Sequence, residues 1–162
     1  MPRIPPLDEA SSSPFSGIMR RRPEVAARWA QLDGQLRFHG LLAPELKEQV
    51  RRTLAQLTGC AYCASLGLPD PAPIDPRTPA ATRFATSVAQ SPTGVADEDW
   101  AELEAHFSPD ELVELTCWIS FMFASEMFGA MMRLEPADEL AVAQYEEMLR
   151  RGFEAAKRPQ HA

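Results

Sequence analysis

Two cysteines separated by two residues, Cys60 and Cys63, form the pair of side chains in this sequence with the clearest capacity for chemistry. A Cys-x-x-Cys spacing lowers the thiol pKa and allows one thiol to resolve, as a disulfide, what the other has attacked. We therefore predict a redox site that reduces a peroxide or exchanges disulfides. The alternative is that both cysteines are buried structural residues with unreactive thiols.

The other cysteine and the histidines lie far from this pair in the sequence. Cys117 falls in an apolar segment and is predicted to be a small core residue. A zinc site normally needs four ligands, and His39, His106 and His161 do not have metal-ligand spacing. The sequence predicts neither a metal site nor a cofactor.

Length and charge narrow the class of protein. A chain of 162 residues fits one domain with its own core. The net charge of -7 disfavours nucleic acid and anionic membrane as partners. The longest apolar run, 117–124, is far shorter than the ~20 residues of a membrane span, so no transmembrane helix is predicted. Three cysteines without an N-terminal leader predict a cytoplasmic location.

The elements that must position the cysteines are all predicted to be helices. Residues 1–22 contain prolines and serines without periodicity, which predicts an extended or flexible N-terminal arm. Residues 23–162 are predicted to form one helical domain, because apolar residues recur at helical spacing and no segment alternates with the period of a strand. The predicted fold class is an all-α bundle.

The cysteines follow directly after a predicted amphipathic helix. This helix opens at Pro44, ends at Gly59 and carries four apolar side chains on one face, Leu46, Val50, Leu54 and Leu57. Cys60 and Cys63 are then predicted to begin a short helix, whose N-terminus favours a thiolate. The prolines within 69–79 prevent this helix from running far.

A capping box marks the start of the most apolar helix. Ser108 and Glu111 stand three residues apart with Pro109 between them, which is a strong helix-start signal. The helix that follows, up to Pro136, is apolar on nearly all sides. It is therefore predicted to be central, or to bury one face in the core and another against a second copy of the chain.

The segment 36–42, Glu48 twelve residues before Cys60, and the Cys60 and Cys63 pair resemble the carboxymuconolactone decarboxylase and alkylhydroperoxidase D-like (AhpD-like) family. The likeness spans about 29–136. The resemblance implies an AhpD-like helical bundle that assembles into homo-oligomers, whether dimers, trimers or hexamers. In this family the redox members reduce peroxides, whereas the decarboxylase members act on a lactone acid and lack the cysteine pair.

Carried over to this chain, the resemblance implies that Cys63 is the attacking thiolate and Cys60 the resolving one. It also implies that Glu48 belongs to a proton relay that reaches Cys63 through a histidine. The family places that histidine four residues after the second cysteine, where this chain has Gly67.

The surroundings of Glu48 can also be predicted. Helical periodicity alone directs Glu48 away from the apolar face and towards solvent. If the carboxylate is buried instead, we expect Arg51, Arg52 or a neighbouring chain beside it, because a buried unpaired charge is costly.

Three functions follow from these observations. The first is a thiol-dependent peroxidase or disulfide oxidoreductase that takes a peroxide or disulfide as substrate and depends on a thiol reductant that the sequence does not identify. The second is a catalytically weakened or non-enzymatic helical oligomer of the same family, suggested by Gly67. The third is a decarboxylase-like member.

Overall fold

The structure is a computed structural model that describes residues 1–7 and 13–157. No strand occurs in this part of the chain, so the all-α prediction is confirmed. The helices are α1 (Pro14–Met19), α2 (Pro23–Phe38), α3 (Pro44–Ala55), α4 (Ala61–Ser65), α5 (Thr78–Gln90), α6 (Asp97–Glu104), α7 (Pro109–Met132) and α8 (Glu139–Ala156).

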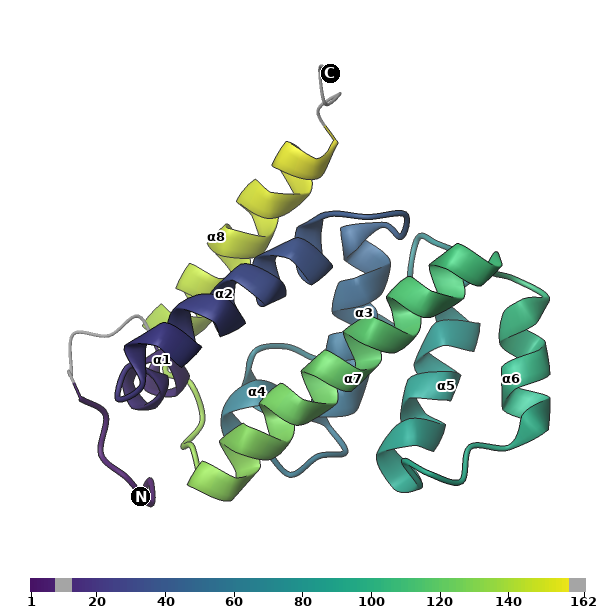
Figure 1. The fold of residues 1–162 in the computed structure, drawn as a ribbon. Coiled ribbons are helices and arrows are strands. Elements are labelled where there is room, and N and C mark those ends of the chain that lie inside the picture. The colour runs from purple at the N-terminus through teal and green to yellow at the C-terminus, as the bar shows by residue number, and fades with distance from the viewer. Residues whose placement is uncertain (8–12, 158–162) are drawn as a thin grey trace.

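Helix α7 crosses the centre of the molecule, with α5 and α6 on one side and α1, α2 and α8 on the other (Figure 1). The predicted capping box at its start is confirmed. The Glu111 N–H donates to Ser108 Oγ at 3.4 Å, and the Ser108 N–H donates to Glu111 Oε2 at 2.9 Å. The helix ends before Pro136, because Arg133 takes a left-handed conformation with φ of 53°.

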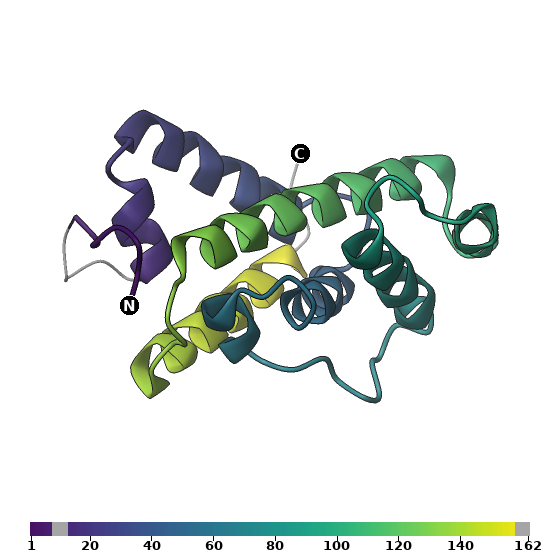
Figure 2. The same ribbon diagram turned by 90° about the horizontal axis from the view of Figure 1, so that it is seen from below.

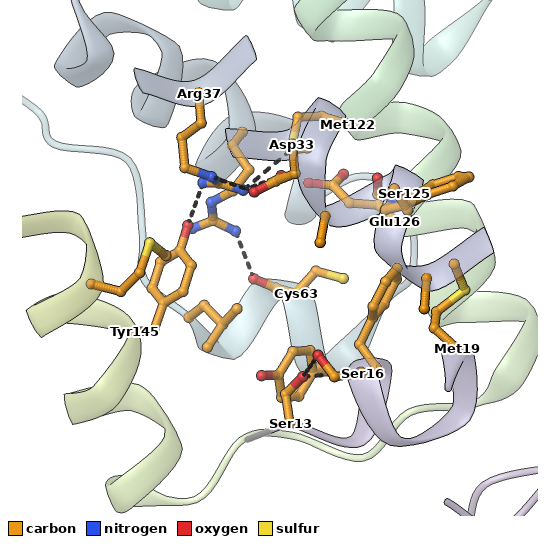
Figure 3. Close-up of a pocket in the computed structure, with 18 of the residues that line it drawn as sticks. Ser13, Ser16, Met19, Asp33, Arg37, Cys63, Met122, Ser125, Glu126 and Tyr145 are labelled. Carbon is orange, nitrogen blue, oxygen red and sulfur yellow. Dashed lines mark hydrogen bonds and ion pairs between the residues drawn. The ribbon is translucent and has the colours of Figure 1, made fainter. Parts of the chain in front are cut away.

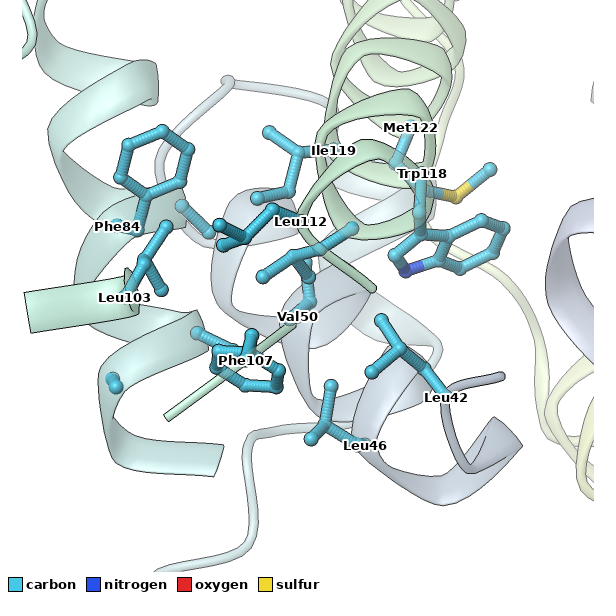
Figure 4. Close-up of a cluster of buried hydrophobic side chains, with 14 of the residues drawn as sticks. Leu42, Leu46, Val50, Phe84, Leu103, Phe107, Leu112, Trp118, Ile119 and Met122 are labelled. Atoms are coloured by element: carbon cyan, nitrogen blue, oxygen red, sulfur yellow. The ribbon is translucent and has the colours of Figure 1, made fainter. Parts of the chain in front are cut away.

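The main core lies where α3, α5 and α7 meet (Figure 4). Three of the four apolar residues predicted to share one face of the second helix are fully buried in it, Leu46, Val50 and Leu54. The fourth, Leu57, lies beyond the end of α3 at Ala55 and is exposed. Trp118 is fully buried in this core, and its indole N–H donates to the Lys47 carbonyl at 2.7 Å.

The outer face of α7 is apolar and exposed. By length and composition alone, α7 could cross a membrane, but its inner face contacts α2, α3, α4, α5 and α6. Val113, Cys117 and Met131 lie on the outer face. The prediction that Cys117 is a core residue is therefore wrong. At about 100° per residue, position 117 turns away from the buried stripe that contains Leu115 and Trp118.

Part of the segment 1–22 is helical, although the sequence predicts an extended or flexible arm there. Helix α1 begins after Ser13, whose hydroxyl accepts the Ser16 N–H, and it has Pro14 at its first position. This pair is itself a helix-start signal. In the view of Figure 2, turned by 90° from that of Figure 1, α1 and α2 lie above α7 and α8 lies below it. The buried side chain of Ile18 then packs into a second apolar cluster, which includes both Cys60 and Cys63.

Candidate redox site

The two cysteines form a disulfide at the start of α4. Gly59 takes a φ of +77°, which only glycine adopts easily, and this turn separates the cysteines from α3. Cys60 is the N-cap residue of α4, and its Sγ accepts the Cys63 N–H at 3.2 Å. The predicted position of the pair at a helix start is therefore confirmed.

Only one of the two sulfur-bearing residues faces an open space. Cys63 lines a cavity of about 580 Å³, whereas Cys60 lies behind it with only 1% of its surface exposed. The cavity is walled mainly by apolar side chains, among them Phe15, Met19, Trp29, Met122 and Met148. Figure 3 shows the Cys63 side chain facing this space. A molecule in the cavity can therefore approach Cys63 and not Cys60.

Helix α7 passes directly behind the disulfide at Gly129. A Cβ at this position would clash with Cys60 Sγ and would lie 3.3 Å from Cys63 Sγ. Any larger residue would overpack the contact, so glycine is what allows the two sulfurs to lie against the backbone of the central helix.

Glu48 is buried, with 2% of its surface exposed, and its carboxylate is surrounded by donors. Arg51 donates from Nε and Nη2 at 2.9 to 3.1 Å, and Arg52 Nε donates at 2.9 Å. Arg37 Nη1 donates at 3.3 Å and the Tyr145 hydroxyl at 2.8 Å. Periodicity wrongly places Glu48 in solvent, because α2 and α8 cover this face of α3. The expectation that Arg51 or Arg52 accompanies a buried Glu48 is confirmed.

These contacts keep Glu48 ionised. Burial opposes the charged form, but Arg51, Arg37 and Arg52 together outweigh it, so the pKa of Glu48 lies below its ordinary value of 4.5. The network reaches the redox helix through Arg51, whose Nη1 donates to the Cys63 carbonyl at 3.1 Å. Arg51 thus links the carboxylate of Glu48 to the backbone carbonyl of Cys63. The proton-relay role stays a prediction, and the contacts favour a positioning role.

The structure places no histidine of its described residues in the cavity. Neither His39 nor His106 lines it, and His161 lies outside the described residues. Gly67 has a φ of +128°, and a Cβ there would lie 3.1 Å from Arg52 Cζ. Gly67 therefore lies just after α4 and packs against the side chain of Arg52. Its backbone has a conformation that residues with a side chain rarely adopt.

Glu126 is the functional candidate that the sequence analysis missed. It lines the same cavity as Cys63 and is 2% exposed. Its Oε2 accepts the Thr58 hydroxyl at 3.1 Å, and its Oε1 has no hydrogen-bond partner within the described residues. Burial raises the pKa of Glu126 to about 8, so the carboxyl is mostly protonated at neutral pH. One signal in the sequence could have identified it: Glu126 is an acidic residue at helical spacing from the apolar residues Trp118 and Met122.

Comparison with known proteins identifies similar structures but no similar sequence family. No protein-family model matches the chain, and no curated protein is significantly similar to it. An uncharacterized peroxidase-related protein from Silicibacter sp. TM1040 shares the fold with a TM-score of 0.68 and 14% identity, over 80% of this chain and 78% of that one.

The second similar structure carries a more specific description. It is an alkylhydroperoxidase AhpD core, an uncharacterized peroxidase-related protein from Ralstonia eutropha JMP134, with a TM-score of 0.61 and 19% identity over 77% of both chains. The fold is therefore an AhpD-like helical fold. Within it, this chain carries a Cys-x-x-Cys disulfide beside an apolar cavity, which supports a redox role.

Proposed function

We propose that this protein is a cytoplasmic thiol-dependent peroxidase, in which Cys63 attacks the peroxide and Cys60 resolves the product. One observation carries this proposal: of the two disulfide-bonded residues, Cys63 alone lines a largely apolar cavity. The peroxidase-related descriptions of the two similar structures are consistent with it. Cytoplasmic thiol reductants would return the disulfide to the reduced pair.

The reaction has two steps. The Cys63 thiolate attacks the terminal oxygen of the peroxide, so that an S–O bond forms, the O–O bond breaks and an alcohol leaves after taking up a proton. Cys60 then attacks the sulfenic sulfur of Cys63 and displaces water, which yields the disulfide that the structure contains. The Cys63 N–H, 3.2 Å from Cys60 Sγ, stabilises negative charge on the resolving sulfur.

A peroxide suits this site better than a protein disulfide does. Only 8% of the Cys63 residue surface is exposed, and side chains from α1, α2, α7 and α8 border the cavity in front of it. Thiol–disulfide exchange with a protein requires two sulfurs to meet in line, which needs an accessible thiolate. A small hydroperoxide needs only to enter the cavity.

Single cysteine variants test this assignment, with Cys117→Ser as the shared background because that thiol is exposed. The reduced parent should lose both remaining thiols when cumene hydroperoxide is added. Cys60→Ser should react at a similar rate and stop at a sulfenic acid that dimedone traps. Cys63→Ser should react at least about 100-fold more slowly, as expected when the activated nucleophile is removed. The measurement is stopped-flow kinetics with mass spectrometry of the products.

The opposite pattern decides between the alternatives. If Cys63→Ser consumed hydroperoxide as fast as the parent, the proposed roles would be wrong. If neither thiol of the parent reacted, the protein would fit the non-enzymatic oligomer that Gly67 suggests.

We also propose that the chain forms a homo-oligomer through the outer face of α7. This face presents exposed apolar side chains along the helix, Val113, Met127 and Met131. Exposed apolar side chains that share one helix face favour an interaction site over a free surface. Sedimentation at micromolar concentration should give a mass above that of one chain, and Val113→Lys with Met131→Lys should restore the monomer. A monomeric parent would contradict the proposal.

A further inference from the structure

Two contacts fix the position of Glu126 relative to the cysteines. Thr58, two residues before Cys60, donates its hydroxyl to Glu126 Oε2. One helical turn after Glu126, Gly129 lies against the two sulfurs, so that any Cβ there would meet Cys60 Sγ and Cys63 Sγ. The Glu126 side chain therefore lies on the same face of α7 that packs against the disulfide. Figure 3 shows Glu126 and Cys63 facing the same cavity from opposing helices.

The second carboxyl oxygen of Glu126 is left without a partner. Oε1 is buried and has no hydrogen bond within residues 1–7 and 13–157. A buried polar group without a hydrogen bond is costly, so each such group calls for an explanation. A group that binds next to Cys63 would supply the missing partner.

We propose that Glu126 is a catalytic residue that donates the proton to the leaving oxygen when Cys63 reduces a hydroperoxide. This inference rests on the peroxidase function proposed above. The S–O bond forms as the O–O bond breaks, and the departing alkoxide takes the Glu126 proton to leave as an alcohol. Cys60 then displaces water from the Cys63 sulfenic acid with its own thiol proton, and Glu126 regains a proton from solvent.

The charges around Glu126 suit this role. Burial is the largest influence and raises its pKa to about 8; Glu48 adds to the rise, whereas Arg51 and Arg37 lower it. Tyr145 from α8 and Cys63 from α4 also face the cavity. Below about pH 8 the carboxyl therefore holds a proton, and as a neutral group it does not repel the Cys63 thiolate. An alkoxide is far more basic than this carboxylate, so proton transfer to it is downhill.

Leaving groups of different basicity provide the test. An alkyl hydroperoxide expels an alkoxide, which needs a proton, whereas peracetic acid expels acetate, which does not. In the reduced Cys117→Ser background, Glu126→Gln should slow Cys63 oxidation by tert-butyl hydroperoxide by about 10²-fold, the scale of general acid catalysis. Oxidation by peracetic acid should change less than about threefold. The measurement is stopped-flow kinetics at pH 7, with circular dichroism to compare the folds.

The pH profile gives a second readout. With tert-butyl hydroperoxide, the rate of the Glu126-containing protein should rise as Cys63 ionises and fall again above about pH 8, where Glu126 loses its proton. Glu126→Gln should lack the fall.

Three outcomes would overturn the assignment, and they differ from one another. Equal slowing with both oxidants would mean that Glu126 only supports the fold or the thiolate. Unchanged rates with both would mean that the proton comes from elsewhere. If Cys63 of the Glu126-containing protein reacted with neither oxidant, the peroxidase function itself would fail, together with the role of Glu126.

Discussion

Replacement of Glu48 by glutamine is expected to lower the free energy of unfolding by about 3–5 kcal/mol at pH 7, the usual effect of breaking a buried ion pair. The variant keeps the shape of the side chain but leaves the buried guanidinium groups of Arg37 and Arg51 without their shared carboxylate. Arg52 and the hydroxyl of Tyr145 lose the same partner. Urea denaturation of the disulfide-containing protein measures the effect.

An exposed glutamate provides the matched control. Glu147 also contacts two arginines, Arg150 and Arg151, but it lies on the surface of α8, so Glu147→Gln should change stability little.

The effect of Glu48 should also depend on pH. Its folded pKa lies below its ordinary value of 4.5, so its contribution is complete above pH 4.5 and is lost as the pH falls through the folded value. The difference between parent and Glu48→Gln should shrink in acid. Equal stability of the two proteins at pH 7 would contradict the structural role of Glu48.

Replacement of Glu126 by glutamine is expected to raise the free energy of unfolding, whereas replacement of Glu48 lowers it. The folded pKa of Glu126 is about 8, against an ordinary value of 4.5. Between these values the folded state holds a proton that the unfolded state has lost, so the stability of the parent falls as the pH rises. Glu126→Gln removes this dependence and should be more stable than the parent by on the order of 5 kcal/mol at pH 8 and above.

The informative quantity is the difference in unfolding free energy between Glu126→Gln and the parent, because contributions from other titrating groups cancel in it. It should be small below pH 4.5 and should grow between pH 4.5 and pH 8. A difference that stays constant over this window would show that Glu126 titrates normally. A more stable variant that reduces hydroperoxides more slowly is the trade-off expected of a group held in place for catalysis.

Local signals predicted most of the fold. The capping box of Ser108 and Glu111 defines the start of α7, and Gly59 marks the turn before the cysteines, because both act through neighbouring backbone groups. Ser13 with Pro14 carries the same kind of signal for α1. This helix was not predicted, because the prolines and serines around the pair favoured an extended arm.

The candidate site was predictable only where it is local in sequence. Cys60 and Cys63 follow from their spacing, and Arg51 and Arg52 lie within one turn of Glu48. Tyr145 reaches Glu48 across 97 residues, and Thr58 reaches Glu126 across 68 residues. Such partners depend on how helices pack, and periodicity within one helix contains no information about its neighbours.

The anchoring of Glu48 by three arginines and a tyrosine has an evolutionary consequence. Because its loss would destabilise the bundle, selection for stability alone would preserve a glutamate twelve residues before the cysteine pair, even in a descendant whose thiols no longer react. Retention of Glu48 across relatives would therefore trace ancestry of the scaffold, whereas joint retention of Cys63 and Glu126 would trace the chemistry.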